Sequence, residues 1–164
     1  MVRIKFIYEE NMCKAFVEES NPYLILNLEE FVYRRGISST SHCDFLYIMG
    51  NNSGTYNIYL VELKDVDCET DIDKIISHIS KFLVNKLPQT KQLVSDLIDF
   101  LRIGNVNYYG ILVLPECVIS KLYEHYSIIS KKIKLNFENS WISACNNDVN
   151  ILNISNVLYN RMFP

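Results

Sequence analysis

Two short apolar runs separated by a turn-rich stretch are the clearest pattern in this sequence. Residues 43–49 and 56–61 each read as a strand, and glycine, asparagine and serine fill the stretch between them. The pattern predicts a β-hairpin over residues 42–64. Since side chains two apart in a strand point to the same face, Glu62 and Lys64 at its end are expected to project together.

Helical spacing dominates the segments on either side of the hairpin. Residues 71–83 carry apolar side chains three and four apart, which predicts a helix, and Leu87-Pro88 is expected to end it. A second helix is predicted over residues 89–103. Upstream, residues 21–35 also read as a helix, with Asn21 as its cap.

The second half of the chain alternates strand and helix patterns. Residues 107–115 are nearly all apolar and predict a central strand, and residues 118–130 predict another helix. Residues 131–137 alternate basic with apolar side chains and read as an edge strand, and residues 149–154 read as a last strand. The order predicts a single α/β domain over the 164 residues, with a mixed central sheet flanked by helices.

Composition narrows the class of protein. Hydrophobic residues make up 49% of the chain, which excludes a disordered chain, yet no apolar stretch is long enough to span a bilayer. Residues 1–8 are basic and then apolar, and the apolar part is too short for the core of a signal peptide. They read as a first strand or as the start of a buried element. We therefore expect a cytoplasmic protein with no membrane partner. The net charge of -3 argues against a protein that only coats nucleic acid, but not against a metal-dependent enzyme.

The cysteines give no metal-binding pattern. They are scattered along the chain at Cys13, Cys43, Cys68, Cys117 and Cys145. With no Cys-x-x-Cys pair, a zinc ribbon or knuckle is not expected. The sequence predicts buried free thiols in a reducing compartment.

The hairpin carries an arrangement of charged residues that resembles a known family. Asp44 lies near the start of its first strand, and Glu62-Leu63-Lys64 closes the second. This order is similar to that of the PD-(D/E)XK nuclease superfamily, which includes restriction endonucleases and Holliday-junction resolvases, although Cys43 stands where the family has proline. Gln92, followed by leucine on a later helix, looks like the Gln-Leu signature of that family. The resemblance implies a restriction-endonuclease-like core.

The resemblance also implies a metal site for phosphodiester hydrolysis. Asp44, Glu62 and the Leu63 carbonyl would bind Mg²⁺ or Mn²⁺, cations that prefer oxygen ligands. Lys64 would orient the attacking water or stabilise charge on the phosphate, and Gln92 would reach toward the site. An acid from the first helix completes the site in many members. Glu30 is the preferred candidate here, with Glu29 beside it and a solvated acidic pair as the alternative.

The resemblance implies that the protein is a metal-dependent nuclease that hydrolyses phosphodiester bonds of nucleic acid, with DNA as the expected substrate. Restriction, recombination or mobile-element defence are the settings it suggests, and a homodimer would let so small a domain engage both strands. One alternative is a nuclease-fold protein without catalysis that serves as a binding or assembly subunit of a larger complex. A second alternative is an unrelated α/β interaction module in which Asp44, Glu62 and Lys64 lie far apart. Glu62 and Lys64 could also form an ion pair at the strand end that has no chemical role. No glycine-rich phosphate loop or serine or cysteine nucleophile motif is present.

Overall fold

The computed structural model describes residues 3–9, 12–18, 23–36, 41–50, 54–125, 140–145 and 152–153. The strands are β1 (Arg3–Glu9), β2 (Met12–Glu18), β3 (Tyr23–Asn27), β4 (Phe45–Gly50), β5 (Tyr56–Leu63), β6 (Val106–Pro115), β7 (Ser140–Cys145) and β8 (Leu152–Asn153). The helices are α1 (Leu28–Arg34), α2 (Ile72–Lys81), the π-helix η1 (Phe82–Lys86), α3 (Leu87–Phe100) and α4 (Glu116–Glu124). The predicted α/β class is confirmed.

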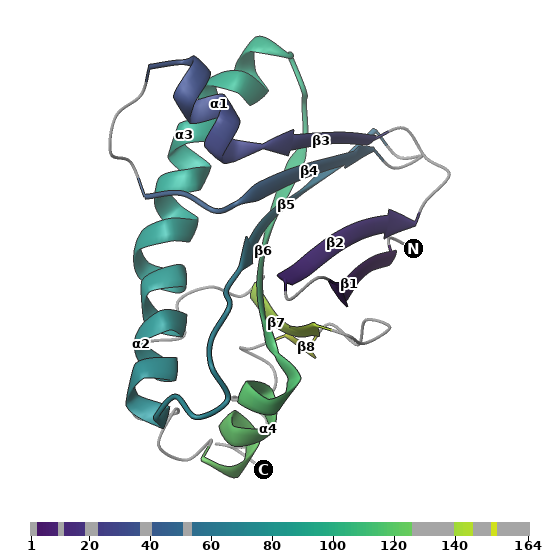
Figure 1. The fold of residues 1–164 in the computed structure, drawn as a ribbon. Coiled ribbons are helices and arrows are strands. Elements are labelled where there is room, and N and C mark those ends of the chain that lie inside the picture. Colours follow the sequence, from purple (N-terminus) through teal and green to yellow (C-terminus); the bar gives the residue numbers. More distant parts are fainter. Residues whose placement is uncertain are drawn as a thin grey trace, which may run out of the picture.

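A mixed sheet forms the centre of the molecule. Among the described residues it has six strands in the order β3-β4-β5-β6-β7-β8. The pairs β3–β4, β4–β5 and β7–β8 are antiparallel, whereas β5–β6 and β6–β7 are parallel. The long helical column of α2, η1 and α3 runs along one side of this sheet, and the β1–β2 hairpin lies on the other (Figure 1). The predicted hairpin and the central position of the 107–115 strand are both confirmed.

The two faces of the sheet enter two separate apolar clusters, because alternate side chains of a strand point to opposite faces. Leu46, Ile58 and Leu60 belong to the larger cluster, together with the buried side chains of α2, η1 and α3. Tyr47 and Val61 belong to the smaller cluster on the opposite face, which also receives Cys13 of β2. Even-numbered positions of β4 and β5 therefore face the helices.

The predicted break at Leu87-Pro88 is wrong. The helix continues from α2 into α3 through the five-residue π-helix η1, and Pro88 lies in the first turn of α3. The Leu87 N–H donates to the Phe82 carbonyl five residues back, as in a π-turn. This wider turn accommodates a ring that would clash with the preceding turn of an ordinary α-helix.

The prediction of one helix over residues 21–35 is wrong in its first half. Tyr23–Asn27 forms strand β3, which pairs with β4 at the edge of the sheet. The helix begins only at Leu28, where the Asn27 side chain accepts from the Glu30 N–H at 3.1 Å and so acts as the N-cap in place of Asn21. The period of so short an apolar run does not distinguish helix from strand. Its secondary structure is decided by the strand β4 that pairs with it.

The prediction of free thiols is wrong for four of the five cysteines. Cys13 of β2 is joined to Cys145 of β7, and Cys68, after β5, is joined to Cys117 of α4. The partners lie 132 and 49 positions apart, so only the tertiary fold brings them together. Cys43 is free and buried.

Four further predictions concern the first and last parts of the chain. Arg3–Glu9 forms strand β1, the first of the two alternatives for residues 1–8, and α4 confirms a helix in the described part of residues 118–130. The predicted edge strand 131–137 lies outside the described residues, and of the last predicted strand only β8 is described. Within the described part of the chain, no helix is long and apolar enough to cross a membrane.

A glycine on β6 sets how closely the helical column approaches the sheet. A Cβ added at Gly110 would lie 2.7 Å from one Leu87 methyl carbon and 3.2 Å from the tip of the Phe82 ring. We expect Gly110→Ala to lower the free energy of unfolding by about 1–3 kcal/mol, because the core there is already filled. Urea denaturation would measure the change.

The matched control is Gly104→Ala, since a Cβ at Gly104 has no atom within 4 Å. That variant should stay within about 0.5 kcal/mol of the parent protein. Equal stability of the two variants would contradict the close approach of Leu87 to β6.

Candidate active site at the β4–β5 hairpin

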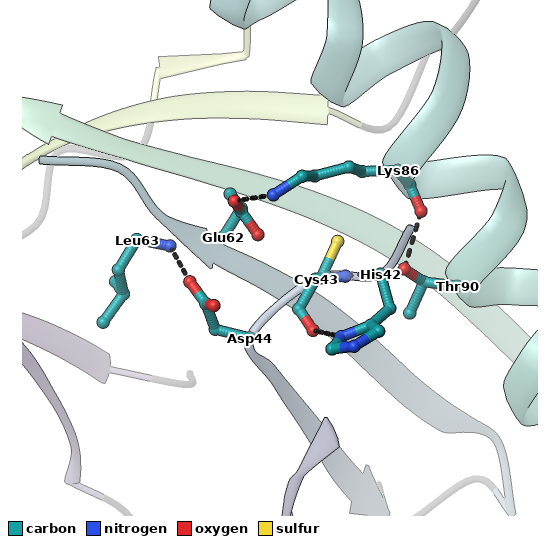
Figure 2. Close-up of polar contacts among 7 residues, drawn as sticks. All are labelled: His42, Cys43, Asp44, Glu62, Leu63, Lys86 and Thr90. Atoms are coloured by element: carbon teal, nitrogen blue, oxygen red, sulfur yellow. Dashed lines mark hydrogen bonds and ion pairs between the residues drawn. The ribbon is translucent and has the colours of Figure 1, made fainter. Parts of the chain in front are cut away.

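Two carboxylates lie near each other where β4 begins and β5 ends (Figure 2). Asp44 directly precedes Phe45, which pairs with Val61, and Glu62 follows Val61 on β5. The Asp44 N–H donates to the Val61 carbonyl at 3.0 Å, and the Leu63 N–H donates to Asp44 Oδ2 at 2.8 Å (Figure 2). The hairpin backbone itself therefore fixes the position of the Asp44 carboxylate.

Glu62 is a buried acid on the face of the sheet that the helices cover. It is only 4% exposed, since it shares the orientation of Ile58 and Leu60. Its Oε1 accepts from Lys86 Nζ, whereas its buried Oε2 has no hydrogen-bond partner among the described residues (Figure 2). Burial raises the pKa of Glu62, the Asp44 charge raises it further, and the Lys86 and Lys64 ammonium groups lower it in part.

Lys86 is the partner of Glu62 that the sequence analysis did not predict. It is the last residue of the π-helix η1, and its side chain is 29% exposed. It lies on the buried stripe of the helical column, between Phe82 and Val94, where an apolar residue is the usual choice. A π-turn is often found at a functional site, and this one brings a cation to a buried carboxylate.

Thr90 connects the segment before Asp44 to the same helical column by hydrogen bonds. Its hydroxyl donates to the Lys86 carbonyl at 2.6 Å and accepts from the Cys43 N–H at 2.8 Å (Figure 2). Lys86 and Thr90 are polar residues four positions apart on an otherwise apolar helical stripe. This pattern in the sequence indicates a polar contact on the buried side of the helix. Burial raises the pKa of the Cys43 thiol to about 12, so Cys43 is no nucleophile.

Lys64 leaves the sheet directly after β5. Its N–H donates to the Val113 carbonyl at 3.0 Å, which extends the pairing of β5 with β6. The Lys64 charge acts on Glu62, but its ammonium forms no ion pair within the described part of the chain. The structure thus brings Asp44, Glu62 and Lys64 into one region and adds Lys86 to it.

Two other predicted residues lie elsewhere. Gln92 is exposed on α3, turned away from the side that carries Thr90 and Val94. Helix α1 does begin beside the site, because the Leu28 N–H donates to the Asp44 carbonyl at 3.0 Å. Glu30, however, is exposed and forms an ion pair with Arg34 at 2.7 Å, the solvated alternative weighed for this acid.

The donor set suits one divalent cation with few protein ligands. Among the described residues, no group of three or more His, Cys, Asp or Glu side chains could hold a metal ion. Asp44 and Glu62 each retain one carboxylate oxygen without a hydrogen bond from the described residues, and that of Glu62 is buried. A buried anionic oxygen without a donor is a position that a cation or water would satisfy. The Leu63 carbonyl, as a third ligand, stays a prediction.

No protein-family model, curated protein or solved structure matches the chain.

Proposed function

We propose that this protein is a metal-dependent nuclease of the PD-(D/E)XK type that hydrolyses phosphodiester bonds in DNA. The single observation that carries the proposal is the buried Glu62 carboxylate, which has one oxygen without a partner and lies near Asp44 on the β4–β5 hairpin (Figure 2). The order of elements agrees with a restriction-endonuclease-like core, in which the hairpin is followed by helices and then by a strand parallel to β5.

Asp44, Glu62 and the Leu63 carbonyl would hold Mg²⁺ or Mn²⁺. When bound, the ion would lower the pKa of a coordinated water and neutralise charge on the scissile phosphate. The Leu63 N–H holds the Asp44 carboxylate in place at 2.8 Å, so that this ligand needs little reorganisation to bind.

The two lysines have different tasks in this proposal. Lys86 donates to Glu62 and favours its ionised form, which burial disfavours. Lys64 has no ion pair among the described residues, which leaves its ammonium free to orient the attacking water or to contact a phosphate oxygen. Lys86 is therefore a positioning residue and Lys64 the residue that would contact the substrate.

A second candidate is a nuclease-fold subunit that binds or assembles without cleaving. The Glu62–Lys86 ion pair favours it, because a structural lysine already occupies one of the two carboxylate oxygens. Calorimetric titration with Mn²⁺ distinguishes the two candidates: micromolar binding that Asp44→Asn weakens supports the nuclease, and no binding supports the subunit.

The direct test is cleavage of supercoiled plasmid and of labelled oligonucleotides with Mg²⁺ or Mn²⁺. We expect cleavage with either metal, none in EDTA, and a rate at least about tenfold lower for Asp44→Asn, because the metal site loses a negative charge. The asparagine oxygen can still accept from the Leu63 N–H, so the hairpin should be retained. Cleavage at the parent rate by Asp44→Asn would refute the site and indicate a contaminating nuclease.

A further inference from the structure

Helix α2 presents two lysines and a histidine on one side. Lys74, His78 and Lys81 follow one another at helical spacings of four and three, opposite the buried residues Ile75 and Ile79. Lys74 and Lys81 are exposed and His78 is half-buried. We call these three residues the α2 basic face.

The lysines of the α2 basic face, Lys74 and Lys81, form no ion pair with a carboxylate of the described residues. Asp71, the acid one turn before Lys74, accepts from the Lys74 backbone N–H as the N-cap of α2. The lysine ammonium groups are thus available to an external anion.

The α2 basic face belongs to the same helical column as Lys86, the partner of Glu62. Burial lowers the pKa of His78, and the charges that lower it further are those of four lysines: Lys64, Lys81, Lys74 and Lys86. Two of these, Lys64 and Lys86, also act on Glu62. Lys64 and Lys86 therefore act electrostatically both on His78 of α2 and on Glu62 of the site.

We propose that the α2 basic face binds the phosphate backbone of the nucleic acid beside the carboxylate site. Lys74 and Lys81 are seven positions apart, which is about 10 Å along the helix axis and about three nucleotide steps along one strand of a duplex. Lysine is suited to this contact as a compact point charge that needs no fixed geometry. Such contacts position the substrate without reading its sequence. The choice of nucleic acid as the polyanion rests on the proposed function.

The test is fluorescence anisotropy with a labelled duplex DNA in EDTA, where binding is measured without hydrolysis. We expect Lys74→Gln and Lys81→Gln each to weaken binding about threefold to tenfold, and to reduce the slope of log K against log salt by about one. The control is Lys91→Gln, the same charge change at an exposed lysine of α3 whose ammonium lies 4.8 Å from the centre of the Tyr108 ring. Binding by this variant should stay within about twofold of the parent.

The outcomes separate this inference from the proposed function. The proposed role of the α2 basic face is wrong if Lys91→Gln weakens binding as much as Lys74→Gln and Lys81→Gln do. It is also wrong if none of these variants changes binding. Both conclusions hold even if the protein cleaves DNA. Salt-dependent binding that only the two α2 variants weaken supports the proposed role, even if no cleavage with Mg²⁺ or Mn²⁺ is found. Because both α2 lysines are exposed, thermal unfolding followed by circular dichroism should show all variants folded.

Discussion

Replacing Lys86 with methionine is expected to lower the cleavage rate about a hundredfold and the free energy of unfolding by about 3 kcal/mol. The variant leaves the Glu62 carboxylate buried without its donor, and breaking one side of a buried ion pair is far more destabilising than losing a surface pair. We expect a loss at the low end of the range for breaking a buried ion pair, because the Lys86 side chain is partly exposed. Urea denaturation at neutral pH and plasmid cleavage measure the two effects.

Two further variants make this prediction specific. Lys64→Met should also slow cleavage but should change stability by no more than about 0.5 kcal/mol, since Lys64 has no ion pair among the described residues. The double variant Glu62→Gln/Lys86→Met should recover most of the stability lost in Lys86→Met, because it leaves no buried charge uncompensated. Lys86→Met as stable as the parent protein would contradict the buried ion pair.

The nearness of Asp44 to Glu62 (Figure 2) could be predicted because it depends on local rules. A hairpin with a short turn pairs its strands in order, and the period of two puts Glu62 on a definite face. The central position of β6 followed from its unbroken apolar character, which only a strand covered on both faces can sustain. For these elements, local pattern and tertiary structure agree.

Lys86 could not be predicted by the same reasoning because a proline usually ends a helix. The π-turn of η1 lets the helix continue through Pro88, and this continuity aligns Lys86 and Thr90 with the stripe that faces the sheet. Gln92 resembles a family signature, but the helical period turns it away from that stripe. The helical period of the full column would have favoured Lys86 over Gln92.

The remaining errors come from contacts between distant parts of the chain. The pairing of β3 with β4 makes residues 23–27 a strand, and nothing within those five residues decides between strand and helix. The cysteine pairs likewise depend on the packing of β2 against β7 and of the loop after β5 against α4. Spacing along the chain carries no information about such partners.

Glu62→Gln is expected to lower the cleavage rate about a thousandfold while leaving the protein folded, because it removes a charged metal ligand and keeps the shape of the side chain. Its effect on stability should depend on pH. Burial raises the pKa of Glu62, so on raising the pH the unfolded chain releases this proton before the folded protein does. In EDTA, the free energy of unfolding of the parent protein should therefore fall as the pH rises from about 4.5 through the raised pKa, by at most about 1.4 kcal/mol per pH unit from this group.

Cleavage by the parent protein should rise over the same pH interval, since only the ionised carboxylate binds the metal. As the pH rises, the cleavage rate should therefore increase while the free energy of unfolding decreases. These opposite changes would show that ionised Glu62 is needed for metal binding but destabilises the folded protein. Urea denaturation at several pH values, for the parent and for Glu62→Gln, isolates the contribution of this one group because the variant cannot titrate. If the difference in unfolding free energy between the two proteins does not change with pH, Glu62 is not a buried carboxylate with a raised pKa, and the proposed metal site is wrong.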